Sequence, residues 1–140
     1  MQPSTHLAID PRLCGTPVSI AEGCASVELL SVPEMAADAH GLVHGGFVFG
    51  LADYAAMLAI NEPNVVLGSA EVRLSAPVAV GDALRADAKR VRIEGKKHMV
   101  EVTVLCTRAE PRSSSASVLS GTFVCFVPNA HVLDARKATP

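Results

Sequence analysis

The longest apolar run of the 140-residue chain reads FVFGLADYAAMLAI and spans residues 47–60. The run is too long for a buried strand, and its Ala, Leu and Met residues favour helices, so it predicts a helix. Apolar residues occur on every side of this predicted helix, which is typical of a buried one. The following segment, NEPN at 61–64, supplies the signal that ends it.

The rest of the chain shows the two-residue period of β-strands. Ala70, Val72 and Leu74 alternate with polar residues, which predicts a strand with one covered face. Further strands are predicted over 83–93, 100–107 and 118–127, with turns at 81–82 and 94–96 and a Ser-rich loop over 111–117. The last strand is apolar on both faces, which indicates a central position or a subunit interface. Before the helix, residues 17–21 and 24–32, with a turn at 22–23 between them, predict a short hairpin or a bulged strand.

The length and composition are those of one globular domain. Apolar residues make up 49% of the chain and charged residues 19%, which excludes a disordered protein. One helix and five or six antiparallel strands form an α+β domain in which the sheet wraps around the helix. We expect a single domain over 1–140, with its core at about 17–127 and flexible ends at 1–12 and 129–140.

Several classes of protein are excluded by the same composition. Aromatic residues make up only 4% of the chain and its formal net charge is −2, so we expect no nucleic-acid partner. The first twenty residues lack the pattern of a signal peptide, and the apolar run is too short to span a membrane. The four cysteines form no CxxC pair, which is typical of thiols in a reducing compartment. We therefore expect a soluble, cytoplasmic protein without a membrane partner.

Asp53 is the unusual residue of the predicted helix. It lies among apolar residues, with no Lys or Arg within one helical turn. A buried carboxylate without a cation costs several kcal/mol or takes up a proton at a higher pH than usual. Asp53 is therefore either a catalytic acid or base, or a residue that lies on a narrow exposed strip or bonds to Ser or Thr hydroxyls.

A His-Gly-Gly sequence, His44 to Gly46, stands directly before the helix. Glycines let the backbone approach a ligand, and free N–H groups at a helix start can bind an anion or a developing oxyanion. The same sequence also suits an ordinary turn. His40 and His44 have no third ligand at a recognisable spacing, so we expect no metal site.

Residues 38–53, DAHGLVHGGFVFGLAD, resemble the signature of the PaaI-type hotdog thioesterases. In that family an HGG loop opens the central helix and an acid follows nine residues after the His, as Asp53 follows His44. The later PVAVGD at 77–82 is similar to a second family pattern. The resemblance implies a hotdog fold, hydrolysis of a small, medium-chain or aromatic acyl-CoA, a homodimer, and no metal or redox cofactor. We also expect two dimers to join as a tetramer, because the outer face of the sheet needs cover.

The resemblance also assigns roles to single residues. Asp53 corresponds to the catalytic acid, the Gly45 N–H polarises the thioester carbonyl, His44 flanks the site and Gly46 contacts the substrate. Asp38 stands where the family commonly has an Asn. Two carboxylates at one thioester would raise one pKa, unless Asp38 turns away.

Gly45 and Asp53 are separated by about 12 Å along one helix, at about 1.5 Å per residue. A general base must lie within about 3 Å of its target, or one water molecule further. One chain therefore cannot easily supply both residues to one carbonyl. If both act, they come from two subunits and the site lies at a dimer interface.

Three further residues are weaker candidates for substrate binding. Ser69 and Glu71 lie on the polar face of a predicted strand and either line an acyl pocket or face solvent. Arg90 belongs to a hairpin rich in Lys and Arg, which either meets the CoA phosphates or is a solvated edge. Two other functions stay open: an acyl-CoA-binding protein without catalysis, and a hotdog enoyl-CoA hydratase or dehydratase.

Overall fold

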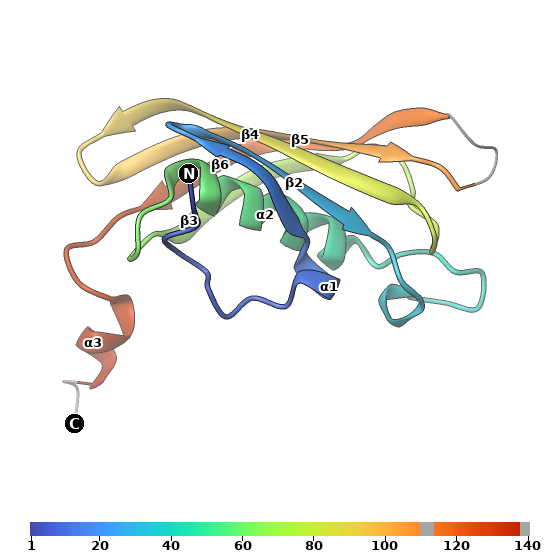
Figure 1. Ribbon diagram of the computed structural model, residues 1–140, viewed down its shortest axis with the longest axis horizontal. Helices are drawn as coiled ribbons and strands as arrows, with labels where there is room; N and C mark the ends of the chain where they lie inside the picture. Colours follow the sequence, from blue (N-terminus) through green and yellow to red (C-terminus); the bar gives the residue numbers. More distant parts are fainter. Residues whose placement is uncertain (110–113, 138–140) are drawn as a thin grey trace.

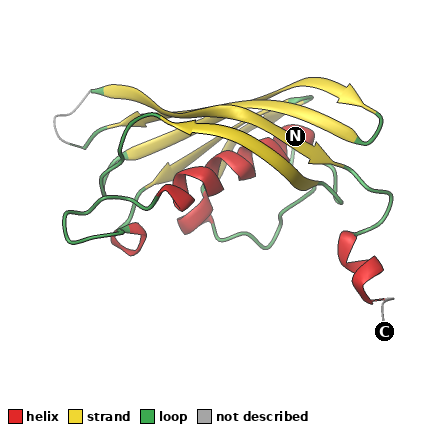
Figure 2. Ribbon diagram, turned by 180° about the vertical axis from the view of Figure 1, so that it is seen from behind, coloured by secondary structure: helices red, strands yellow, loops and turns green. Residues whose placement is uncertain are grey.

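A computed structural model describes residues 1–109 and 114–137 and has two layers, a six-stranded antiparallel sheet and one long helix (Figures 1 and 2). The strands are β1 (Thr16–Ala21), β2 (Cys24–Leu30), β3 (Val66–Leu74), β4 (Ala83–Glu94), β5 (Lys97–Thr107) and β6 (Ser115–Phe126). The helices are α1 (Pro11–Cys14), α2 (Gly45–Ile60) and α3 (Val132–Lys137), with a 3-10 turn, η1, at Pro33–Met35. The predicted α+β architecture is confirmed.

The order of the strands is β1-β2-β4-β5-β6-β3, and every neighbouring pair is antiparallel. β2 and β3 are consecutive strands in the chain, joined by η1 and α2. In the sheet, however, β4, β5 and β6 lie between them. The chain therefore passes beneath the sheet as α2 and returns as the edge strand β3 (Figure 1).

Helix α2 ends where the sequence predicts and begins two residues earlier. Asn61 follows the last turn in the left-handed conformation, φ 55°, and its N–H donates to the carbonyl of Met57 at 2.8 Å. The helix packs chiefly against β2, β4 and β5. Four alanines of the helix are almost fully buried, and their small side chains leave room for the strands to pack closely; they are Ala52, Ala55, Ala56 and Ala59.

Strand β6 differs from its prediction in length and in pattern. It begins at Ser115, so 115–117 belong to a strand rather than to the expected loop, of which 111–113 lie outside the described residues. Leu119 and Phe123 face α2 and are buried, whereas Ser120 and Thr122 are exposed. The outer face of β6 thus mixes these hydroxyls with the apolar Phe126, which is 39% exposed. The strand lies inside the sheet, between β5 and β3, and cover of its outer face by a second subunit stays a prediction.

Strand β3 turns the predicted apolar residues toward the α2 side of the sheet, but these residues are not buried there. Its register with β6 sets Ala70 opposite Phe123 and Leu74 opposite Leu119, so these residues point to the side of the sheet that carries α2. Leu74 is nevertheless 53% exposed, and Ala70 is also exposed. Because α2 packs mainly on the other strands, the edge at β3 stays open.

The N-terminal segment is anchored at points that its aperiodic sequence does not predict. The Ser4 N–H donates to Asn61 Oδ1 at 2.7 Å, Asn61 Nδ2 donates to the Gln2 carbonyl at 3.0 Å, and the terminal amine of Met1 bonds to the Ile20 carbonyl at 3.3 Å. Helix α3 extends away from the sheet (Figure 2). The flexibility of both ends stays a prediction. Across the described residues no helix has the length and apolar character needed to cross a membrane.

Candidate active site

Asp53 is half-buried, with one of its carboxylate oxygens inside the protein. Its Oδ1 is shielded from solvent and has no hydrogen-bond partner in the described structure. Burial raises the pKa of Asp53 from 3.8 to about 6. The expected carboxylate without a cation is therefore present, and it holds a proton to an unusually high pH.

Two thiols lie within electrostatic range of Asp53. Burial, and after it the Asp53 carboxylate, raises the pKa of Cys125 on β6 to about 12. Burial, Asp10 and Asp53 in turn raise the pKa of Cys14, which ends α1. Both thiols therefore stay protonated near neutral pH and add no charge beside Asp53.

The start of α2 offers free backbone donors. His44 is the N-cap residue and makes no capping bond with its side chain. The first N–H groups of a helix have no intrahelical acceptor, and no hydrogen bond within the described residues occupies those of Gly45 and Gly46. A Cβ on Gly45 would lie 3.1 Å from Leu74 Cδ1, and one on Gly46 would lie 3.2 Å from the His44 ring. A side chain at Gly45 or Gly46 would crowd the start of the helix, so glycine at both positions keeps these N–H groups accessible.

A cavity of about 340 Å³ opens beside Gly45, between the helix start and the end of β3. We call it the Gly45 cavity. Its lining side chains are apolar except for Ser75, and backbone groups add polar surface; the residues are Val43, Gly45, Val48, Leu74, Ser75, Ala76, Pro77 and Val78. An apolar cavity next to free N–H groups can hold a thioester with its carbonyl oxygen against a donor.

Asp53 lies on the same side of α2 as Gly46 and Gly50, since residues three, four and seven apart share a helix face. A Cβ on Gly50 would meet nothing within 4 Å, so this face of α2 is open. Within one chain, Gly45 and Asp53 are eight residues and about 12 Å apart on a continuous helix. The structure therefore brings His44, Gly45 and Gly46 together and leaves Asp53 two turns away.

Asp38 is exposed and bonds within its own loop. Its Oδ1 accepts the N–H groups of His40 at 2.9 Å and Leu42 at 3.2 Å. Whether Asp38 also reaches a thioester at a shared site stays a prediction. The carboxylate stabilises the loop that leads to His44.

Ser69 and Glu71 lie on the other face of the sheet. They alternate with Ala70 and Val72, which face α2, and Glu71 is paired with the exposed Thr122. Within one chain the sheet therefore separates both residues from Asp53, so they do not line a pocket on the helix side.

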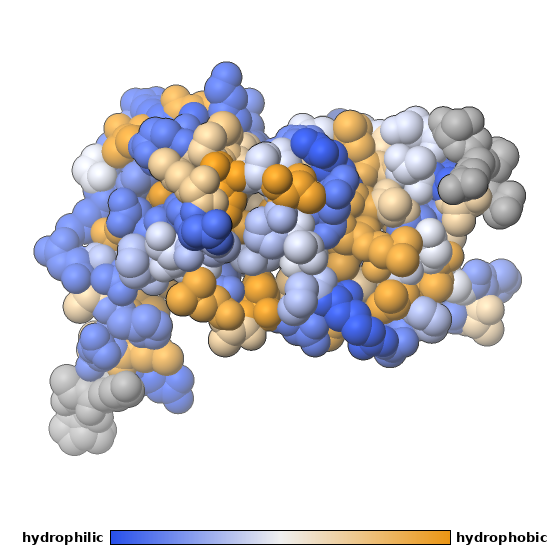
Figure 3. Space-filling model, viewed as in Figure 1, coloured by the Kyte–Doolittle hydropathy of each residue, from blue (hydrophilic) through white to orange (hydrophobic). Residues whose placement is uncertain are grey.

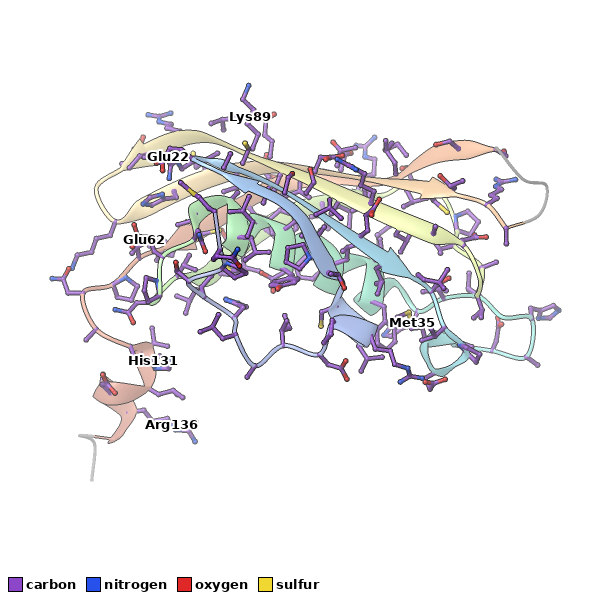
Figure 4. All side chains as sticks on the ribbon, in the orientation of Figure 1. Glu22, Met35, Glu62, Lys89, His131 and Arg136 are labelled. Atoms are coloured by element: carbon purple, nitrogen blue, oxygen red, sulfur yellow. The ribbon has the colours of Figure 1, made fainter. Side chains whose placement is uncertain are left out.

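Arg90 lies at the far end of the helix from Gly45. Its guanidinium donates to Glu22 Oε1 at 3.0 Å and lines a cavity of about 340 Å³ beside Asn61. Figure 4 shows Glu22 at the opposite end of the molecule from Met35, whose carbonyl accepts the His44 N–H at 2.9 Å. Arg90 is thus not brought to the helix start of its own chain.

Sequence reasoning missed a second cavity at the helix start, which we call the Arg108 cavity. It has a volume of about 390 Å³ and is lined by His40, Leu42, Pro77, Val78, Ala79, Asp82 and Arg108. Three separate segments form it, so no local motif indicates it. Among residues 1–109 and 114–137, no three His, Cys, Asp or Glu side chains are grouped as metal ligands would be.

The comparison with protein families matches residues 40–108 to the thioesterase superfamily. The matched segment contains the helix start, Asp53 and both cavities at this end of the sheet. The chain belongs to the thioesterase superfamily. Its one long helix, α2, beneath an antiparallel sheet is the hotdog fold, as predicted.

Solved structures of the hotdog fold agree over most of the domain. The uncharacterized protein PH1136 from Pyrococcus horikoshii is 53% identical, with a TM-score of 0.87 over 96% of this chain and 98% of that one. A mutant of the phenylacetic acid degradation protein PaaI from Thermus thermophilus is 27% identical, with a TM-score of 0.69 over 83% and 95% of the two chains. The PaaI-like character of the domain rests on this likeness together with the HGG sequence.

The chain spans less than half the length of the curated relatives that it matches. A methylthioribose-1-phosphate isomerase from Aquifex aeolicus is 49% identical over 108 residues, which are 77% of this chain and 23% of that protein. The transcription factor FapR from Caldanaerobacter subterraneus is 29% identical over 70% of this chain and 46% of that protein. The shared part of each relative is thus one domain of a longer protein.

Proposed function

We propose that this domain hydrolyses the thioester of a small, medium-chain or aromatic acyl-CoA. The observation that carries the proposal is the buried Asp53 carboxylate, whose Oδ1 has no hydrogen-bond partner in the described structure. A stable fold does not need such a group in a helix, because burying it costs free energy. A general base near neutral pH does need one, because its pKa must be close to the working pH.

The proposed reaction uses the helix start of one subunit and Asp53 of the other. The Gly45 N–H donates to the carbonyl oxygen and stabilises the oxyanion. Asp53 accepts a proton from water while the water oxygen bonds to the carbonyl carbon, and the carbon–sulfur bond then breaks. The proton passes to the departing CoA thiolate, beside which His44 lies. Direct attack by Asp53, through a mixed anhydride that water then cleaves, is the alternative route.

Two features support a dimeric site. Gly45 and Asp53 of one chain are too far apart to serve one carbonyl, as the helix geometry requires. The open edge at β3 also exposes Leu74 beside the Gly45 cavity. The outer face of the sheet carries exposed apolar residues, Leu105 on β5 and Phe126 on β6, besides the polar Ser120 and Thr122. We therefore propose a homodimer, with this face as the surface at which two dimers would join.

The choice of coenzyme A as the thiol of the substrate rests on a solved structure with the same fold. A hypothetical thioesterase from Streptococcus pneumoniae TIGR4 has the same fold, with 20% identity and a TM-score of 0.68, and was crystallised with coenzyme A. The proposed chemistry needs water and a carboxylate and uses no metal or redox cofactor.

The test is a thiol-release assay with short-chain, medium-chain and aromatic acyl-CoA substrates. Wild type should release CoA from at least one class, and Asp53→Asn should lower kcat by roughly 10²-fold or more. Glu71→Gln is the matched control, because it removes an exposed carboxylate from the other face of the sheet. Equal rates for wild type and Asp53→Asn would remove Asp53 as the catalytic acid. Tight acyl-CoA binding without turnover would favour a binding protein, and water addition to an enoyl-CoA would favour a hydratase.

A further inference from the structure

We propose that the Arg108 cavity binds the phosphates that follow pantetheine in the CoA portion of the substrate. This inference rests on the proposed thioesterase function. It assigns Arg108 as the residue that distinguishes a phosphorylated pantetheine thioester from an unphosphorylated one.

The Arg108 cavity and the Gly45 cavity are neighbours. Pro77 and Val78 line both of them. The wall between the loop and these residues is fixed by backbone hydrogen bonds: the Val43 N–H donates to the Val78 carbonyl at 2.8 Å, and the Val80 N–H to the Gly41 carbonyl at 2.9 Å. A ligand can therefore extend from the helix start into the second cavity along a rigid surface.

The adjacency of the two cavities suits an extended arm. Leu42 in the Arg108 cavity is only three residues from Gly45 along the chain, and Pro77 and Val78 belong to both linings. Pantetheine separates the sulfur of CoA from its first phosphate by a long, flexible and mostly apolar chain. With the carbonyl at Gly45, this chain would cross Pro77 and bring the phosphates to the Arg108 cavity.

The charges of the cavity suit an anion. Arg108 forms no ion pair and no side-chain hydrogen bond with the other described residues. Its guanidinium is thus available for a bidentate bond to phosphate oxygens, the geometry that arginine favours. His40 lies on the same rim. Figure 3 shows hydrophobic and hydrophilic residues side by side over this face of the molecule.

Asp82 also lines the cavity, but its carboxylate is engaged in the wall. It accepts the N–H groups of Ala79 at 2.9 Å and Ala109 at 3.0 Å, and the Cys106 thiol lies 3.6 Å from it. Asp82 is only 6% exposed. These donors compensate its charge, so we assign it the structural role of joining the strand β5 end to the β3–β4 connection.

Arg90 is the competing cation. It is already paired with Glu22 and lies at the other end of α2, beside Asn61. An arginine in an ion pair must lose that partner before it binds a phosphate, whereas Arg108 has no such partner among the described residues. The geometry therefore favours Arg108.

The experiment compares three thioesters that carry the same acyl group: acyl-CoA, acyl-4′-phosphopantetheine and acyl-pantetheine. Arg108→Gln should raise KM for both phosphorylated substrates by roughly tenfold or more, the loss expected for charge-assisted hydrogen bonds. Its kcat, and its KM for acyl-pantetheine, should stay within about twofold of wild type. The unphosphorylated substrate thus reports whether the variant is folded and active. Arg90→Gln is the matched control and should not discriminate between the three.

Each other outcome overturns the assignment. Equal loss on all three substrates would give Arg108 a structural role only. Loss with acyl-CoA alone would place the nucleotide 3′-phosphate, and not the pantetheine phosphate, at Arg108. Discrimination by Arg90→Gln would move the subsite to the other end of α2. If wild type hydrolyses none of the thioesters, the proposed function fails; calorimetry with free CoA and pantetheine then tests the cavity, and equal CoA affinity of wild type and Arg108→Gln would refute it.

Discussion

Replacing Asp53 with asparagine should stabilise the protein and do so more at high pH than at low pH. The side chain keeps its shape but loses its charge. Burial raises the pKa of Asp53 from 3.8 in the unfolded chain to about 6 in the folded one, so the folded protein binds this proton more tightly. The stability from protonating Asp53 is therefore fully present below pH 3.8 and is lost as the pH rises through about 6.

The size of the effect follows from the two pKa values. At about 1.36 kcal/mol per pKa unit, this pKa difference changes the free energy of unfolding by about 3 kcal/mol. The change is that between a pH at which Asp53 is fully protonated in both states and a pH at which it is fully ionised in both. Between pH 5 and pH 8 the linkage relation gives a loss of about 1.4 kcal/mol for wild type from this one group. Asp53→Asn has no carboxylate there, so its advantage over wild type should be larger at pH 8 than at pH 5 by about that amount.

Urea denaturation at fixed protein concentration measures this difference. The free energy of unfolding would be determined for wild type, Asp53→Asn and the Glu71→Gln control at pH 5 and pH 8. An advantage of Asp53→Asn that does not change with pH, or a variant less stable than wild type at pH 8, would refute the assignment of a buried, uncompensated charge. A similar pH-dependent gain in Glu71→Gln would show that the effect comes from net charge.

Three further predictions concern the site and the sheet. Mixed dimers of Gly45→Pro and Asp53→Asn chains should recover about one quarter of wild-type thiol release, because half of the random dimers hold one intact shared site; no recovery in verified heterodimers would contradict a shared site. Asp38→Ala should lower the free energy of unfolding by about 1 kcal/mol, since two loop N–H groups lose their acceptor, whereas Asp38→Asn should not; equal losses in urea denaturation would contradict this role. Gly121→Ala should cost roughly 1–3 kcal/mol, because its Cβ would lie 2.4 Å from the Glu71 carbonyl oxygen; an unchanged urea midpoint would contradict the β3–β6 register.

The parts of the fold that depend on local pattern were predictable from the sequence. The apolar run at 47–60 lies in α2, and the two-residue period places Val100, Val102 and Val104 on the buried face of β5. The helix start was placed two residues late because Gly45 and Gly46 have low helix propensity. Asp53 could be identified because a charge inside an apolar helix is visible in the sequence itself.

The parts that depend on pairing between distant strands were not predictable. Ser69 and Glu71 are polar and alternate correctly, but only the register with β6 shows that they face away from α2. The exposure of Ser120 and Thr122 on β6 was missed because both stand among bulky apolar residues. The Arg108 cavity forms only where three distant chain segments meet, so the sequence does not indicate it. The sequence pointed instead to Arg90, because that residue lies in a hairpin rich in Lys and Arg.

The pH dependence of kcat/KM for thiol release tests the role of Asp53 most directly. If its carboxylate, with a pKa of about 6, accepts the proton from water, kcat/KM should rise about tenfold per pH unit below pH 6 and level off above it. The residual activity of Asp53→Asn should lack this inflection. A wild-type profile that is flat between pH 5 and pH 8, or an inflection that persists in Asp53→Asn, would contradict catalysis by Asp53.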